Sequence, residues 1–308
     1  MRTTRRLTRR SGTHAVFAIC ALAVCALVAC ASGTSAAVAQ DDASSWREIE
    51  TKYVFGFTTG SGIGLEGEKE FTVDSVGRFG KRDGHYAATE TKYEFEFTPS
   101  QFVQIEFGAL GSSHNIDAMT DLAARNQIAF AGGFAEFRYL AIERTSNNPL
   151  SVTLAVEPTV RLIDETSGSR VNNYEFETTV NADLELLKNR LYAGFNVLYE
   201  PEVTRIVAGT QREATIGGSA ALAVRLAPNL LVGAEMWYLR HYDSPTLSDY
   251  TGDALMAGPT LYVKFTSKMF MTAAWNAQVR GHEVGNPSSL NLSEFQRHRA
   301  RLKFAYEF

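Results

Sequence analysis

The sequence predicts an all-β protein, a transmembrane antiparallel up-and-down β-barrel of about 12 strands. Apolar and polar side chains alternate with a period of two along one segment after another, which is the period of a strand. The polar face carries clusters of charge, which a soluble two-sheet sandwich does not require. Lipid outside and water inside explain both faces, and a closed barrel satisfies its backbone hydrogen bonds in lipid. At this width we expect polar side chains and water to fill the interior.

Residues 1–39 are predicted to be a signal peptide. Five arginines precede the apolar stretch Ala15–Ala29, and Ala37–Ala39 offers a small-x-small cleavage site. All three cysteines lie in this segment, so the mature chain is expected to have neither disulfides nor thiolate metal sites. Leu27–Cys30 resembles a lipoprotein box, which leaves lipidation of Cys30 as an alternative.

Residues 40–67 are predicted to be a lead-in segment that lies on the periplasmic side of the barrel or in its lumen. Glu48–Thr59 alternates like a strand, and Gly60–Gly67 is rich in glycine and turn-forming. Counting Glu48–Thr59 as a strand would make the total odd, whereas two termini on the same side of the membrane require an even number. We therefore place the start of the barrel at residue 68.

Residues 68–308 are predicted to form the barrel, with connections that alternate between short turns and longer loops. Phe130 and Phe134 share the face that later carries Glu136, so a bulge is expected at Gly132. Pro201–Gln211 is expected to be a loop. The predicted strands are Glu68–Gly80, His85–Phe97, Phe102–Gly111, Gln127–Glu143, Leu150–Ile163, Asn173–Leu186, Leu191–Glu200, Arg212–Leu226, Leu230–His241, Ala254–Thr266, Met269–Arg280 and Gln296–Phe308.

The charged residues predicted to line the lumen are segregated by sign along the chain. Early strands supply acids and the last strand supplies bases. Because closure places the last strand beside the first, we expect the bases to pair with Glu68, Glu70 and Asp74. The predicted lining consists of Glu68, Glu70, Asp74, Glu90, Glu94, Glu96, Glu106, Glu175, Glu177, Asp183, Arg297, Arg299, Arg301 and Lys303.

This lining has two interpretations. An acidic wall that faces a basic wall creates a transverse field, which favours passage of small polar or charged solutes through a passive channel. Alternatively, the charges neutralise one another in a closed structural barrel with a salt-bridged lumen.

The closing strand places Phe304, Tyr306 and Phe308 at alternate positions and ends on an aromatic residue. This ending resembles the last strand of Gram-negative outer-membrane β-barrels. The resemblance implies location in the bacterial outer membrane, contact with its lipid, and recognition of these three aromatic residues by the barrel-assembly machinery.

Three short stretches are loosely similar to poorly characterised barrels of aromatic-degradation pathways. They are Gly62–Gly67, Phe137–Leu140 and Val156–Pro158. The resemblance implies passive uptake of small solutes without indicating which solute, and the oligomeric state stays open.

We expect no enzymatic activity, cofactor or metal site. Outer-membrane phospholipases need a His-x-Ser pair on one strand face, which this chain lacks. Asp83–His85 resembles the Asp-x-His pair of omptin proteases, but a second aspartate pair is missing. The net charge of −4, which becomes more negative when the arginine-rich signal peptide is removed, argues against nucleic acid as a partner.

Overall fold

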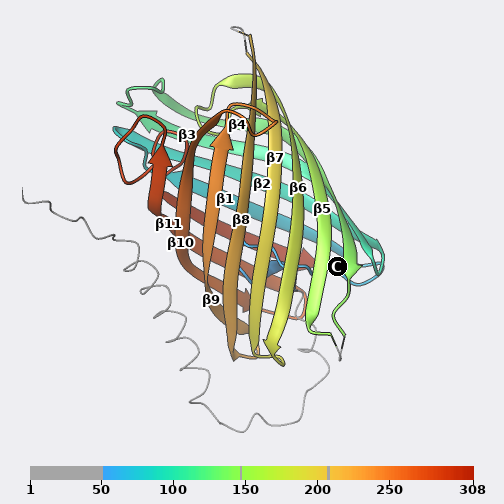
Figure 1. Cartoon of the computed structure of the whole chain (residues 1–308). Coiled ribbons are helices and arrows are strands. Elements are labelled where there is room, and N and C mark those ends of the chain that lie inside the picture. The colour runs from blue at the N-terminus through green and yellow to red at the C-terminus, as the bar shows by residue number, and fades with distance from the viewer. Residues whose placement is uncertain (1–50, 146–147, 207–208) are drawn as a thin grey trace, which may run out of the picture. The chain divides into compact units, whose positions relative to one another are not determined.

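The computed structural model describes residues 51–145, 148–206 and 209–308. The predicted signal peptide and Cys30 lie outside these residues. The described chain forms twelve strands in a closed antiparallel barrel, in which each strand pairs with its neighbours in sequence and β1 closes on β12 (Figure 1). A single 3₁₀ turn, η1 (Thr51–Tyr53), precedes them. The strands are β1 (Lys69–Phe79), β2 (His85–Ser100), β3 (Val103–Asp117), β4 (Arg125–Ile142), β5 (Leu150–Ile163), β6 (Arg170–Leu187), β7 (Leu191–Ile206), β8 (Gly209–Ala227), β9 (Leu230–Tyr242), β10 (Tyr250–Lys264), β11 (Met269–Glu283) and β12 (His298–Glu307).

The barrel has two distinct ends. Short connections 101–102, 188–190 and 228–229 share one end with Phe308, and this is called the turn end. Connections 118–124, 164–169, 243–249 and 284–297 share the other, called the loop end. The predicted fold class is therefore confirmed, including the even strand count. In the described part of the chain, no helix is long and apolar enough to cross a membrane.

The outer surface is apolar along the strands. Phe71, Phe107 and Phe176 are 44%, 52% and 47% exposed, whereas Glu70 and Glu106 on the same strands are 1% and 4% exposed. Alternate residues of a strand point to opposite faces, so the aromatic side chains face outward and the acids face inward. This is the pattern that lipid on the outside requires.

The predicted bulge in β4 is confirmed. The register between β3 and β4 shifts at Leu110/Gly111, and Gly132 has a φ of 138°, which favours glycine. The extra residue reverses the faces, so Phe130 is 64% exposed while Phe134 is 7% exposed. Phe130 and Phe134, an even number of residues apart, therefore face opposite sides of the sheet.

The expected loop Pro201–Gln211 is wrong, because β7 continues to Ile206 and β8 begins at Gly209. Pro201 has no backbone N–H, and the ladder to β6 skips it between Tyr199 and Glu202. On the other side, Pro201 lies opposite Ala214 of β8. Proline interrupts one ladder without ending the strand.

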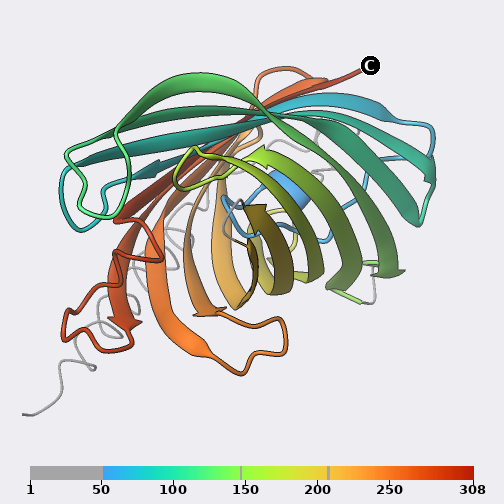
Figure 2. The ribbon, with the colours of Figure 1, turned by 90° about the horizontal axis from the view of Figure 1, so that it is seen from above.

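The interior at the turn end contains part of the chain itself. Residues 51–67, called the inner segment, begin inside the ring of strands, where they appear in blue in Figure 2. Their apolar side chains form a core with residues of the barrel wall, which explains how a barrel of this width packs at one end. The members are Tyr53, Val54, Phe55, Tyr192, Ala221, Ala223, Leu231, Tyr262, Phe270 and Ala305.

Candidate functional site

A charged cavity of about 410 Å³ occupies the interior between the inner segment and the loop end. Fourteen Asp or Glu side chains line it, against eight Lys or Arg side chains. The lining comes from most of the strands and from loops 164–169 and 284–297. The cavity is therefore acidic on balance.

The structure divides the predicted lining residues into groups. Glu70, Glu96 and Asp183 are buried but outside the cavity lining. Glu68 precedes β1 and accepts a hydrogen bond from the Leu65 N–H at 2.9 Å, and Arg297 is exposed just before β12. Those that line the cavity are Asp74, Glu90, Glu94, Glu106, Glu175, Glu177, Arg299, Arg301 and Lys303.

The predicted seam between β1 and β12 carries ion pairs at Asp74. Arg301 donates from Nε to both carboxylate oxygens of Asp74 at 3.0 Å, and Lys303 Nζ lies 3.5 Å from Asp74 Oδ2. Lys303 also donates to Glu94 at 3.0 Å. The predicted pairing is thus confirmed for Asp74. In the strand register, Glu70 lies opposite Glu307.

Arg299 reaches aromatic rings instead of a carboxylate. Its guanidinium lies 4.6 Å from the ring centre of Phe57, on the inner segment, and 6.0 Å from that of Trp237. Arg78 lies opposite it on β1. A desolvated guanidinium gains energy from such ring faces, so this arginine contacts the inner segment and remains a cation at the cavity wall.

The acidic wall lies on β6, β7 and β8, half-way around the barrel from β12. Glu175 lies directly opposite Glu202, and Glu202 directly opposite Glu213, so three carboxylates form a row across three strands. Like charges in directly opposed positions destabilise a sheet. Glu175 has a basic partner, since it pairs with Arg161 at 2.9 Å, whereas Glu200 and Glu202 have none among the described residues.

Sequence reasoning missed Glu202 because it assigned Pro201–Gln211 to a loop, and it left Glu200 and Glu213, at the ends of the two adjoining predicted strands, out of the predicted lining. The alternation of glutamates at 200 and 202, continued past the proline, was the signal that was available.

Lys52 anchors the inner segment to the barrel wall. Its ammonium donates to Glu96 at 2.6 Å and Gln104 at 3.1 Å, and it also pairs with Glu106. Burial alone would lower the pKa of Lys52, but Glu106 and Glu96 outweigh burial and raise the pKa. Lys52 therefore remains charged, and it pairs with two buried carboxyl groups, one on β2 and one on β3.

Two further acids hold the same segment. Asp183 accepts hydrogen bonds from the hydroxyls of Thr51 and Ser61 at 2.7 Å each. Glu235 accepts from the backbone N–H groups of Phe57 and Thr58 at 2.9 and 2.8 Å. Buried backbone donors need such partners, because these residues of the segment belong to no sheet. These buried acids thus bind the chain's own inner segment.

Glu165 ties loop 164–169 over the cavity at the loop end. Its carboxylate pairs with Arg78 of β1 and lies 3.8 Å from Arg161 of β5, and its carbonyl oxygen lies 3.1 Å from Nε2 of His114. Burial would raise the pKa of Glu165, but Arg78 and Arg161 outweigh burial and lower it to about 2. This loop carboxylate is therefore ionised at neutral pH.

Residues 47–308 match the profile of DUF6662, described as a family of unknown function. The chain belongs to this family. Membership in DUF6662 assigns no activity, and a search of curated proteins finds no match.

Comparison with solved structures finds similar chains for this DUF6662 protein. The COG4313 outer membrane channel from Pseudomonas putida F1 is similar over 80% of this chain and 97% of its own, with 9% identity and a TM-score of 0.56. The NanC porin is similar over 77% of this chain and 98% of its own, with 10% identity and a TM-score of 0.47. At such identities the likeness concerns the fold. With its apolar exterior, the chain is an outer-membrane β-barrel.

Proposed function

We propose that the protein is a passive outer-membrane channel that favours small cations and polar solutes. The acidic excess of its cavity carries this proposal, because an acidic water-filled cavity concentrates cations and repels anions. The shared fold with an outer membrane channel supports a transport role.

The division of charge around the cavity supports the same function. Arg301 and Lys303 on β12 are partly neutralised by Asp74 and Glu94, so the cationic wall is compensated. The acidic row on β6 to β8 has much less compensation. A solute that enters from the loop end therefore meets a field that draws positive charge toward β7.

Passage through the turn end requires movement of the inner segment. Tyr53, Val54 and Phe55 are 4%, 1% and 0% exposed within the apolar core at that end. In the arrangement described, the cavity extends to loops 164–169 and 284–297, and the inner segment closes the turn end. We therefore expect brief openings rather than a permanently open pore.

Current through a planar lipid bilayer tests the proposal. Under a KCl gradient, the wild-type protein should give discrete steps with a reversal potential that indicates K⁺ preference. The double variant Glu200→Gln, Glu202→Gln should reduce the K⁺/Cl⁻ permeability ratio by roughly twofold or more, since it removes two cavity carboxylates.

The matched control is Glu143→Gln, an exposed glutamate outside the cavity lining. It should leave the permeability ratio unchanged. Anion preference in the wild type would contradict the proposed selectivity. Absence of any steps from correctly folded protein would favour the closed structural barrel, which the packed turn end makes the competing function.

A further inference from the structure

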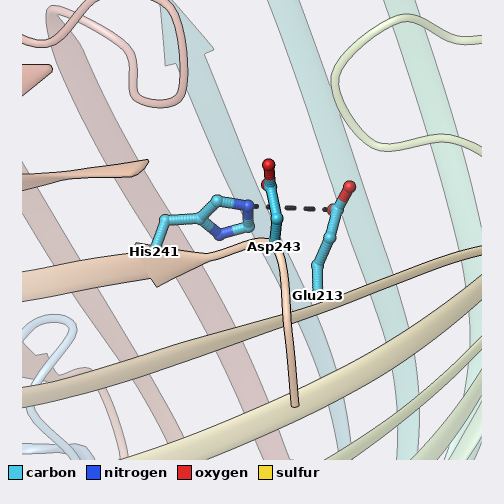
Figure 3. Close-up of side chains that lie close together, drawn as sticks. All are labelled: Glu213, His241 and Asp243. Carbon is cyan, nitrogen blue, oxygen red and sulfur yellow. Dashed lines mark ion pairs between the residues drawn. The ribbon is translucent and has the colours of Figure 1, made fainter. Parts of the chain in front are cut away.

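His241, Glu213 and Asp243 come together at the loop end of the cavity (Figure 3). Glu213 lies near the start of β8, His241 near the end of β9, and Asp243 just beyond β9. One ligand atom of each lies within 4.8 Å of those of the other two. The strand register brings them together, because His241 pairs with Thr215, two residues from Glu213. Sequence spacing gives no sign of this grouping.

The imidazole of His241 is oriented for ligation. Its Nδ1 lies 3.3 Å from the Thr215 hydroxyl, an oxygen partner of the kind that fixes a ligating histidine. Its Nε2 lies 3.8 Å from a carboxylate oxygen of Glu213 and 3.9 Å from one of Glu294. Both distances are too long for a hydrogen bond. Within the described residues, Nε2 therefore faces carboxylates without bonding to them.

Among the described residues, no Lys or Arg forms a salt bridge with Glu213, Asp243 or Glu294. Lys81 donates to the backbone carbonyl of Glu294 at 3.1 Å but forms no salt bridge with its carboxylate. Glu202 lies directly opposite Glu213 and adds a further carboxylate.

A buried acceptor stands beside Glu202. Asn173 is 4% exposed and lines the cavity. Its amide nitrogen donates to Glu202 at 2.7 Å, while its carbonyl oxygen Oδ1 is buried with no donor. An unpaired buried acceptor beside opposed carboxylates is costly.

We propose that Glu213, His241 and Asp243 bind a divalent transition-metal ion, with Glu294 as a fourth ligand from loop 284–297. One imidazole with carboxylates suits Zn²⁺ and similar borderline ions, whereas Ca²⁺ and Mg²⁺ prefer oxygen alone. Two ligands bound at about 2.1 Å lie at most about 4.2 Å apart, so small rotations of the carboxylate ends close the site. This site goes beyond the proposed channel, because it binds an ion rather than passing it.

Titration of the refolded mature protein in detergent with ZnCl₂ and with CoCl₂ tests the site. Calorimetry should show one Zn²⁺ per chain, and bound Co²⁺ should give visible absorption bands of low coordination number. His241→Gln and Glu213→Gln should each weaken Zn²⁺ binding by about tenfold or more. Thr215→Val should weaken it less, because it removes only the hydroxyl beside Nδ1.

His85→Gln is the matched control, since His85 is an exposed histidine at the same end of the barrel and outside the cavity lining. Circular dichroism and heat-dependent gel mobility establish that each variant is folded. Equal Zn²⁺ affinity in wild type and in both ligand variants would overturn the site, as would no binding by the wild type. Conductance measured in EDTA tests the channel without bound metal. Failure of the metal site therefore does not overturn the channel, and failure of the channel does not overturn the metal site.

Discussion

At the scale of single residues, Lys52 is the side chain whose loss should destabilise the barrel most. Lys52→Met leaves Glu96 and Glu106 buried without their cation. Removing one partner of a buried ion pair costs about 3–5 kcal/mol, so the variant should unfold at clearly lower urea concentration. Lys69→Met, at an exposed position in β1, should unfold with the wild type. Equal midpoints for Lys52→Met and wild type would contradict the anchoring role.

Glu165 gives the stability of the barrel an acid dependence. The folded-state pKa of about 2 lies below the ordinary value of 4.5, so the unfolded chain binds the proton first as pH falls. The stabilisation from Glu165 is complete above about pH 4.5 and disappears as pH approaches 2. The difference in urea midpoint between wild type and Glu165→Gln should therefore be larger at pH 7 than at pH 3. A difference in urea midpoint that does not change with pH would show that the ion pairs of Glu165 do not stabilise the barrel.

The sequence predicts contacts between residues of paired strands, but not contacts of residues outside the strands. Asp74 could be assigned to the seam because closure and strand parity fix its neighbours. The partners of Lys52 could not be predicted, because it lies in a segment that pairs with no strand. In such a segment, alternation along the sequence does not indicate which way a side chain points. Glu165 lies in a loop, and its partners depend on how that loop folds inward.

At the scale of elements, the bulge in β4 determines which phenylalanine faces lipid. Gly132 has a φ of 138°, and a Cβ atom there would overlap the carbonyl oxygen of Val160. Gly132→Ala should therefore destabilise the barrel by about 2 kcal/mol. Gly111→Ala, whose Cβ would lie 3.5 Å from the Tyr93 ring, should be nearly neutral. Thermal unfolding in detergent compares the stability of the two variants. Similar decreases in stability would contradict the claim that the backbone conformation of Gly132 requires glycine.

Alternation predicts a strand well where no proline or bulge interrupts it. The hairpin of β2 and β3 follows the expected faces from Glu90 to Glu106. Sequence reasoning fails at Pro201, because the pairing of β7 with β8 continues past a residue that cannot donate to β6. Whether proline ends a strand depends on which neighbour requires its N–H, and the sequence alone does not show that neighbour.

At the scale of the whole molecule, closure could be predicted, whereas the sequence left open whether the lead-in segment lies below the barrel or inside it. Period-two alternation with charge on one face and apolar residues on the other indicates strands between lipid and water, where only a closed barrel satisfies the backbone hydrogen bonds. Whether the inner segment enters the lumen depends on long-range partners such as Asp183 and Glu235, which no local pattern reveals. The acids that sequence reasoning assigned to a solute path are therefore divided between that path and the chain's own segment.

Fixing the inner segment to the wall tests whether it closes the channel. A Cβ atom at Gly194 would lie 2.7 Å from the Phe55 ring, so Phe55→Cys with Gly194→Cys should form a disulfide between the segment and β7. All native cysteines precede residue 31, so the predicted mature protein contains no other thiol. The oxidised double variant should lose the conductance steps, and reduction should restore them. Phe55→Cys alone should conduct in both redox states. If the cross-linked protein conducts like the reduced one, solutes pass without movement of residues 51–67.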